Sequence, residues 1–486
     1  MMLRILLFTP FLAGLASLGI ASDRVRRRLI TAVSFFHLAC SLALWTAGLE
    51  PTAGRWLGLD ALSLLFLLVT SALFAASSFA TVTYLRGHEL PEERRGRLSR
   101  EAVFTCSMLF FLGTTTLAIL SLHTGVFWMA IEATTLASAP MISYQRSSRS
   151  LEAAWKYLLI CSVGIAIALV GNTALAVSIA FHPATYGLPL TFRGLAAHAA
   201  SLHPVWLKVA FAFILVGYGT KMGLAPMHTW LPDAHSEAPS PVSALLSGAL
   251  LNCAFLGILR TNAILVRAGI GDYSNGLLIA FGLGSMFLAG WFILQQADFK
   301  RLLAYSSIEH MGILAIAAGA GASFGGLLHA LNHSLTKGAL FLVAGTILGA
   351  YHTKSTRTVT GVIRVAPMTG LLWLAGFLAI CGVPPFGTFV SEFSVMTVLG
   401  ANGRWWSLAI FLLTLGIVFV GMWRIVIPMA FGCPPESHPS GAPVRFLSVA
   451  DVPPLALLCV VLLLGVWLPE PLTRLVTQAA AVMGGL

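Results

Sequence analysis

Charged residues are scarce in this chain. Only 10% of its 486 residues are Asp, Glu, Lys or Arg, whereas soluble domains carry about 25%. Hydrophobic residues make up 57% of the sequence, and no polar stretch between the apolar runs is long enough to form a soluble domain of useful size. The scarcity of charge therefore excludes a soluble globular protein and predicts a membrane protein.

Several chemical signatures are also missing. The seven cysteines are scattered and form no C-x-x-C pair, so a metal or iron–sulfur site has little support. The sequence has no nucleotide-binding loop and no constellation of nucleophile and base. We therefore expect no catalytic centre, no metal and no cofactor in this chain.

Apolar runs recur along nearly the whole length. Each is about 20 residues long, enough to cross the hydrocarbon core as a helix, and the runs lack the alternation of a membrane β-barrel. We predict an all-α polytopic membrane protein with about fourteen transmembrane helices. The predicted spans are 1–20, 29–49, 59–85, 101–122, 124–145, 153–181, 205–225, 240–265, 276–297, 301–319, 324–350, 366–399, 405–431 and 449–468.

Basic residues are concentrated in alternate loops. The odd-numbered loops hold most of them, with four in 21–28 and five in 86–100, whereas the even-numbered loops hold few, Arg55 among them. By the positive-inside rule the odd loops face the cytoplasm, and both chain termini face the other side. Because the net charge of +11 lies in these short loops, we expect no nucleic-acid partner.

Two proline-containing stretches align without gaps. They are GLAPMHTWLPD (223–233) and GVPPFGTFVSE (382–392), and each interrupts an apolar span. Proline breaks a helix, and paired interrupted helices in the two halves of a chain are typical of inverted-repeat transporters. We predict two inverted five-helix repeats with broken helices 7 and 12. The predicted domains are three N-terminal helices (1–100), the first repeat (101–265), the second repeat (266–431) and a C-terminal helix (432–486).

Ionisable residues inside the spans are functional candidates, because a charge near the bilayer centre costs several kcal/mol. Arginine outnumbers lysine 23 to 6, yet the bases deepest in apolar spans are Lys156, Lys221 and Lys337. Burial can drive lysine, unlike arginine, towards its neutral form. The pattern therefore favours groups that take up and release protons. The acidic and histidine candidates in spans are Glu132, Glu309, His310, His329, His333 and Glu392.

One helix carries three of these groups on a single stripe. His329, His333 and Lys337 recur at i, i+4 and i+8, so they stack along one helix face and could relay protons through intervening waters. The alternative, which holds for a lone histidine, is that each caps a carbonyl or fixes helix packing.

Two further pairs allow a functional and a structural interpretation. Glu132 and Lys221 lie on different spans and could form a buried pair, in which each shifts the other's pKa. Lys156 and Glu152 are four residues apart near the end of a span, where a snorkelling lysine needs no special function.

A polar cluster follows the first break. Its members His228, Asp233, His235 and Glu237 lie between the seventh and eighth spans, on the cytoplasmic side by the loop count. They form either a solvated loop or a mouth at which protons are taken up.

Three motifs carry a resemblance to a known family. KMGLAPMHTWLPDAHSEAPSPVSALLSG (221–248), ADFKRLLAYSSIEHMG (297–312) and LNHSLTKGALF (331–341) resemble the antiporter-like membrane subunits shared by respiratory complex I, multisubunit Na⁺/H⁺ antiporters and membrane-bound NiFe hydrogenases. Within this family the sequence resembles hydrogenase-4 component F, of the formate hydrogenlyase type, in stretches such as AIEATTLASA (130–139).

The resemblance implies a proton-translocating subunit of a redox-driven complex in a bacterial or archaeal inner membrane. It implies as partners other antiporter-like and anchor subunits, peripheral NiFe hydrogenase and iron–sulfur subunits, protons and the lipid bilayer. The alternatives are a Na⁺(K⁺)/H⁺ antiporter subunit, a subunit of a complex I-like NADH or ferredoxin–quinone oxidoreductase, and a structural subunit with a vestigial channel.

The resemblance also implies residue roles. Complex I relatives often have a histidine where this chain has Ser247, so a relay step through that helix must use water or another group. The accessory candidates are Lys156, His228, Asp233, His235, Glu237 and Glu309. The principal proton-transfer residues are Glu132 on helix five, Lys221 on helix seven, His329, His333 and Lys337 on helix eleven, and Glu392 on the broken helix twelve.

Overall fold

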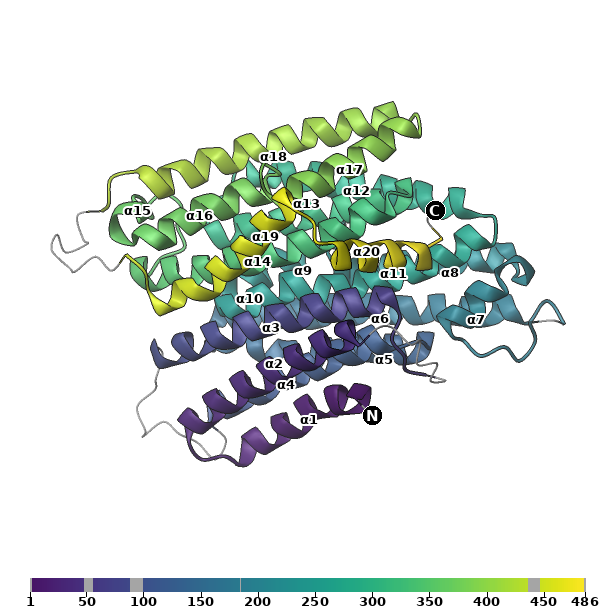
Figure 1. Cartoon of the computed structure of the whole chain (residues 1–486), viewed down its shortest axis with the longest axis horizontal. Coiled ribbons are helices and arrows are strands. Elements are labelled where there is room, and N and C mark those ends of the chain that lie inside the picture. Colours follow the sequence, from purple (N-terminus) through teal and green to yellow (C-terminus); the bar gives the residue numbers. More distant parts are fainter. Residues whose placement is uncertain (1, 48–55, 88–98, 184, 436–445, 485–486) are drawn as a thin grey trace.

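The computed structural model describes residues 2–47, 56–87, 99–183, 185–435 and 446–484. These residues form helices joined by turns and loops, and the β-structure among them is limited to three isolated bridges (Figure 1). Among them, thirteen helices are long and apolar enough to cross a membrane, and the expected twelfth span is divided into two shorter apolar helices. The predicted all-α polytopic fold is confirmed.

The helix bounds follow the predicted spans closely. The first group is α1 (Met2–Gly19), α2 (Asp23–Thr46), α3 (Ala61–Gly87), α4 (Arg100–Leu120), α5 (Thr124–Ile142), α6 (Ser148–Ile179), α7 (Phe192–Ala197), α8 (Pro204–Met222), α9 (Trp230–Glu237) and α10 (Ser240–Leu245). A π-helical turn, Leu246–Leu250, joins α10 to α11. The second group is α11 (Leu251–Arg267), α12 (Gly271–Ile293), α13 (Phe299–Ala320), α14 (Ser323–Tyr351), α15 (Val362–Val365), α16 (Pro367–Ile380), α17 (Gly387–Ala401), α18 (Trp405–Phe431), α19 (Val452–Val466) and α20 (Glu470–Val482).

Both proline-containing stretches interrupt helices. Residues 223–229 separate α8 from α9, and residues 381–386 separate α16 from α17. Each interruption contains an early glycine with a positive φ, 84° at Gly223 and 62° at Gly382, a conformation that glycine adopts without a steric penalty. Within both stretches the backbone therefore leaves helical geometry.

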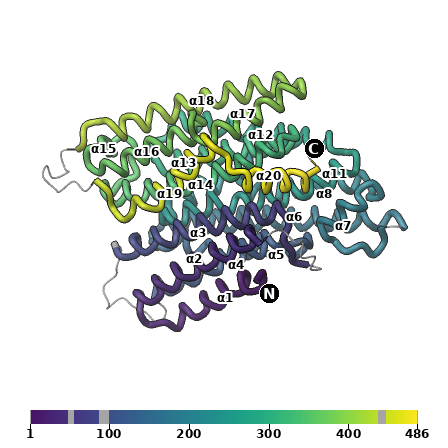
Figure 2. The backbone as a smooth tube through the Cα atoms, in the orientation of Figure 1, coloured from purple at the N-terminus to yellow at the C-terminus, as the bar shows by residue number. Residues whose placement is uncertain are grey.

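The interior of the molecule lies around α14 and the continuous helix Ser240–Arg267. This helix comprises α10, the π-helical turn and α11, and we call it the α10–α11 rod. α14 packs against α3, α10, α13, α16, α17 and α19. Every residue in the most apolar window of Ser240–Arg267 is buried, compared with 28% of the corresponding windows in α1 and α2. α1 and α18 lie at opposite edges of the bundle (Figure 2). Polar groups on α11, α13 and α14 are thus shielded from lipid by other helices.

The second span begins earlier than the sequence predicts. α2 starts at Asp23, not at residue 29, and its first turns include Arg27, which is buried. The Arg27 guanidinium contacts the Glu101 carboxylate of α4 through Nε at 2.8 Å and Nη2 at 2.9 Å. This two-point pair explains why a basic residue counted as part of a loop lies inside the bundle.

Part of the charge pattern cannot be placed. Arg55 and residues 88–98 of the basic loop lie outside the described residues. The sidedness of the termini and the four-domain division remain predictions.

Glycine permits the close approach of α6 and α8. A Cβ at Gly217 would lie 2.6 Å from both the Ala168 Cβ and the Gly164 carbonyl oxygen. Small residues of this kind let membrane helices pack closely.

We predict that Gly217→Ala destabilises the protein by about 1–3 kcal/mol through overpacking, seen as a lower thermal unfolding midpoint in detergent. Gly284→Ala is the matched control, because that glycine of α12 has no atom within 4 Å of the added Cβ; equal midpoints for both variants would contradict the packing.

Candidate functional site

Lys221 lies near the end of α8, just before the first break, and is fully buried. Its ammonium donates hydrogen bonds to the Thr135 hydroxyl and to the Tyr157 hydroxyl, both at 2.7 Å. Tyr157 in turn lies 2.6 Å from the Ser138 hydroxyl. Hydroxyls can both donate and accept, so they can serve either the ammonium or the neutral amine. We call Lys221, Thr135, Tyr157 and their hydrogen-bonded neighbours the lysine cluster.

Glu132 joins this cluster through an intermediary. Its carboxylate accepts a hydrogen bond from Ser162 at 2.7 Å and a longer one from Thr135 at 3.4 Å. Among the described residues no ion pair joins Glu132 to Lys221. Thr135 lies one helical turn after Glu132 on α5 and contacts both charged groups. The two residues are therefore linked through a hydroxyl, in place of the direct pair that the sequence allowed.

The histidine stripe of α14 meets a third histidine from α13. His310 Nδ1 lies 2.9 Å from His329 Nε2, and the His310 ring centroid is 5.2 Å from that of His333. His329 Nδ1 lies 3.0 Å from the Ser391 hydroxyl of α17. All three rings are fully buried. We call His310, His329, His333 and the two glutamates beside them the histidine cluster.

Two buried glutamates border these rings. Glu309 Oε2 lies 3.7 Å from His310 Nε2. Glu392 is 3% exposed, and its carboxylate packs against Gly382, where a Cβ would collide with it. A ligand atom of Glu392 lies within 4.8 Å of ligand atoms of His310 and His329. The second break therefore brings the predicted terminal acid to the histidines.

Lys337 completes the stripe on α14. It is fully buried, and its ammonium donates to the main-chain carbonyl of Leu303 on α13 at 2.8 Å. Neutral hydrogen-bonding groups thus hold both deep lysines, Lys221 and Lys337.

The lysine and histidine clusters lie on either side of the α10–α11 rod, which contributes only neutral polar groups between them. At its π-helical turn, the Ser247 hydroxyl lies 2.8 Å from that of Ser307 on α13. Asn252 Nδ2 donates to the Ser334 hydroxyl of α14 at 2.6 Å and to the Gly248 carbonyl at 2.9 Å. π-helical turns occur frequently at functional sites. Ser247 therefore has a hydroxyl partner on α13.

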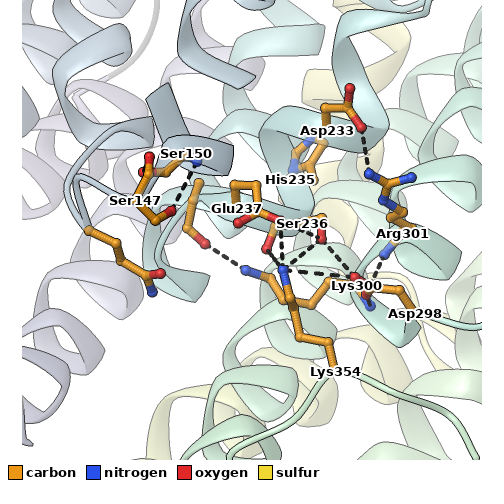
Figure 3. A network of polar contacts seen from close by, with 12 residues as sticks. Ser147, Ser150, Asp233, His235, Ser236, Glu237, Asp298, Lys300, Arg301 and Lys354 are labelled. Carbon is orange, nitrogen blue, oxygen red and sulfur yellow. Dashed lines mark hydrogen bonds and ion pairs between the residues drawn. The ribbon is translucent and has the colours of Figure 1, made fainter. Parts of the chain in front are cut away.

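A network of ion pairs surrounds α9 (Figure 3). Asp233 pairs with Lys156 at 3.0 Å and with Arg301 at 2.7 Å. Glu237 pairs with Lys354 at 2.8 Å. These contacts connect α6 and α9 with the start of α13 and with the segment that follows α14.

Two histidines of the polar cluster are not solvated. His235 is fully buried, stacks on Phe341 with centroids 5.0 Å apart, and has no hydrogen-bond partner at either ring nitrogen among the described residues. His228 is 6% exposed. The solvated-loop interpretation is therefore wrong for both histidines. It fails because α9 folds back against α13.

Two lysines differ from their sequence interpretation. The Lys156 side chain is 46% exposed and pairs with Glu152 at 2.7 Å, so it is not one of the deep bases. Lys300, counted as a loop charge, is 1% exposed and donates to the Ala238 carbonyl at 2.5 Å. Helix α13 begins at Phe299, which places Lys300 in its first turn and under the ion-pair network.

The sequence-based selection missed residues that complete the clusters. Tyr157, Thr135 and Ser391 contact the predicted proton-transfer groups directly. His310, an ionisable residue inside a span, is not among the proton-transfer residues that the sequence predicts. Hydroxyl groups at helical spacing from charged residues were the available signal, as with Glu132 and Thr135. Which of many hydroxyls converge could not be deduced, because the partners come from different helices.

Residues 121–418 match a family described as the transmembrane part of NADH:quinone oxidoreductase and Mrp antiporter subunits. The chain belongs to this family. It is 39% identical over 394 residues to the hydrogenase-4 component F homolog of Methylacidiphilum infernorum, covering 80% of this chain and 81% of the relative. It is 31% identical over 360 residues to hydrogenase-4 component B of Escherichia coli, covering 69% of this chain but only 50% of that longer protein. The resemblance to hydrogenase-4 subunits is confirmed.

Solved structures of related fold include subunits of three respiratory or transport assemblies. A chain of the archaeal membrane-bound sulfane sulfur reductase superposes with a TM-score of 0.85 and 21% identity, covering 99% of this chain and 97% of that one. A chain of the Mrp complex from Dietzia sp. DQ12-45-1b gives 0.84 and 21%, covering 99% and 96%. A chain of complex I from Thermus thermophilus gives 0.76 and 23%, covering 96% and 97%. These likenesses extend the shared fold to nearly the whole chain.

The contact between Gly382 and Glu392 can be tested by a double-mutant cycle. Gly382→Ala places a Cβ against the Glu392 carboxylate and gives alanine a left-handed conformation that costs about 1–2 kcal/mol. We predict that Gly382→Ala lowers the thermal unfolding midpoint. Adding Glu392→Ala to the same chain should recover part of this loss, because it removes the collision. Strictly additive effects of the two substitutions would show that the carboxylate does not lie against Gly382.

Proposed function

We propose that this chain is the proton-translocating membrane subunit of a redox-driven complex of the hydrogenase-4 or formate hydrogenlyase type. The observation that carries the proposal is a pair of buried ionisable clusters, around Lys221 and around His329, with neutral hydrogen-bonding groups of the α10–α11 rod, Ser247 and Asn252, between them. Family membership, and 39% identity to a hydrogenase-4 component F homolog, support this assignment over other redox-driven members.

The first step of the route uses the lysine cluster. A neighbouring subunit that brings charge near the half-buried Glu132 would alter its hydrogen bonds with Thr135 and Ser162. Because Thr135 also accepts from Lys221, a change at Glu132 reaches the ammonium through one hydroxyl. Loss of that acceptor favours release of the lysine proton.

The second step crosses the α10–α11 rod. Asn252 and Ser334, and Ser247 and Ser307, form two hydrogen-bonded pairs between this rod and the second half of the chain. The Asn252 Oδ1 has no hydrogen-bond partner among the described residues, so it can accept a hydrogen bond from a water. Hydroxyls can pass a proton by accepting one and donating another, and an amide can hold the waters in line.

The last steps use the histidine cluster. Lys337 and His333 receive the proton on α14, His310 and His329 share it across a 2.9 Å contact, and Glu392 is the terminal carboxylate. The ion-pair network of Figure 3 lies on the cytoplasmic side by the charge pattern of the loops, and His235 lies behind it as the group through which protons are taken up.

The electron-transfer chemistry belongs to other subunits in this proposal. The partners are antiporter-like and anchor subunits in the membrane, together with peripheral NiFe hydrogenase and iron–sulfur subunits, and this chain holds no cofactor. Its location is the inner or plasma membrane of a bacterium or archaeon.

Lysine substitutions test the proposed route. We predict that Lys221→Met abolishes proton translocation, because it removes the only ionisable group of α8 that contacts the Thr135–Tyr157 hydroxyls in the described structure. Translocation is measured with a pH-sensitive dye in sealed vesicles that carry the assembled complex, driven by its own electron donor. Lys156→Met is the matched control and leaves translocation unchanged, since Lys156 is half-exposed. If Lys221→Met pumped at the wild-type rate in a fully assembled complex, the route would be refuted.

The neutral bridge can be tested in the same vesicles. We predict that Asn252→Leu slows proton translocation about tenfold, the factor that ~1.4 kcal/mol of added barrier produces, because it removes the hydrogen bond to Ser334. Asn262→Leu is the control. That asparagine lies on the same helix but bonds to Asn275, away from the bridge. Equal rates in the two variants would place the proton path elsewhere.

A further inference from the structure

We propose that His310, His329 and Glu392 bind a divalent metal ion of the zinc class, which competes with protons for the histidine cluster. The three residues come from α13, α14 and α17, and one ligand atom of each lies within 4.8 Å of the others. The binding itself stands on this geometry alone. Its effect on transport rests on the proposed function.

The set of donors matches such an ion. Two imidazole nitrogens and one carboxylate form a set of three protein ligands that binds zinc, with bonds of about 2.0–2.2 Å. Tetrahedral bonds of this length separate ligand atoms by about 3.3 Å, so small side-chain movements suffice from the present spacing. Hard ions such as Mg²⁺ and Ca²⁺ prefer all-oxygen sites, which argues for the zinc class.

A buried atom of the third ligand has no partner. Glu392 Oε1 accepts no hydrogen bond among the described residues. Glu392 is 3% exposed. Leaving a buried polar atom unpaired costs about 1–3 kcal/mol, and a metal–ligand bond would offset that cost. Both ring nitrogens of the neighbouring His333 are also unpartnered, so this ring can supply a fourth ligand.

The shared proton occupies the position that the ion would take. His310 Nδ1 and His329 Nε2 lie 2.9 Å apart, so one proton lies between two lone pairs. A metal ion held by both rings must displace this proton, because metal ligands bind in their deprotonated form. Occupation by an ion would therefore exclude proton passage between α13 and α14.

Neighbouring side chains orient the ligands and determine the net charge around the proposed metal site. Ser391 holds the far nitrogen of His329 at 3.0 Å, as outer hydrogen-bond partners commonly do for metal-bound histidines. Two charged groups face the cluster. Glu309, 3.7 Å from His310 Nε2, adds negative charge and favours a dication, whereas the Lys337 ammonium opposes it and is held on the Leu303 carbonyl. The Cys381 thiol, at the second break, also interacts with Glu309 and Glu392 but is not one of the three ligands.

Metal binding is tested on the purified full chain in detergent. Co²⁺ is the spectroscopic probe and Zn²⁺ is the competitor, with bound metal counted after dialysis. We expect one ion per chain, a tetrahedral Co²⁺ absorption that Zn²⁺ removes, and an affinity that falls as the pH is lowered. Ser391→Ala should weaken binding about 10–100-fold, as loss of an outer partner does, and His329→Gln by at least as much.

His37→Gln is the matched control and should bind as the wild type does. His37 is buried among hydroxyls of α3 and α4, 2.9 Å from Ser71 and 3.0 Å from Thr116, so glutamine can keep hydrogen bonds there. Unfolding midpoints of all variants show that each is folded. No stoichiometric binding by the folded wild type, or equal binding by His329→Gln, would mean at most adventitious metal and would overturn the site.

The effect on transport is measured separately, in vesicles that carry the assembled complex. Zn²⁺ should block proton translocation at the concentration that saturates the full chain, and the block should weaken about 10–100-fold in Ser391→Ala. Binding by the full chain without any block would leave the metal site standing and would refute a proton route through these histidines. Absence of binding, with translocation intact, would refute only the metal site.

Discussion

The cost of placing charge inside the bilayer determines how this chain is built. A charged group at the bilayer centre costs several kcal/mol, and three deep bases of the described residues lie among groups that lower the cost. Arg27 is paired with Glu101, Lys221 contacts two hydroxyls, and Lys337 contacts a carbonyl. The most buried rod, α10–α11, carries only neutral polar groups between the two deep lysines.

The lysine cluster and the histidine cluster surround their buried ionisable groups with different kinds of side chain. Around Lys221, hydroxyls surround one base, and its nearest acid acts through Thr135. The second half of the chain instead gathers three histidines and two glutamates in direct proximity. A hydroxyl environment suits a group whose charge responds to a distant acid, whereas contiguous imidazoles suit passage of a proton from ring to ring. The different chemistry also explains why only the second cluster has the donors of a metal site.

Much of the fold follows from local sequence, and much of the site does not. Apolar runs of spanning length predict most of the long helices, and the two glycine–proline stretches coincide with segments that separate helices. The stripe of His329, His333 and Lys337 follows from helical periodicity. The burial of His235 and Lys300 depends on how α9 packs beside α13. The insertion of His310 between two histidines of another helix has the same origin. Such contacts join residues far apart in the chain, and no local pattern encodes them.

The central claim is that the coupling ion is the proton, moved by this chain in response to electron transfer elsewhere in the complex. Its most direct test is internal acidification of inverted membrane vesicles that carry the complete complex, in buffer free of Na⁺ and K⁺. The account predicts that addition of the electron donor acidifies the interior at the same rate with and without Na⁺. Acidification that requires Na⁺ or K⁺ at fixed pH would contradict it and would identify the chain as part of a cation/proton antiporter.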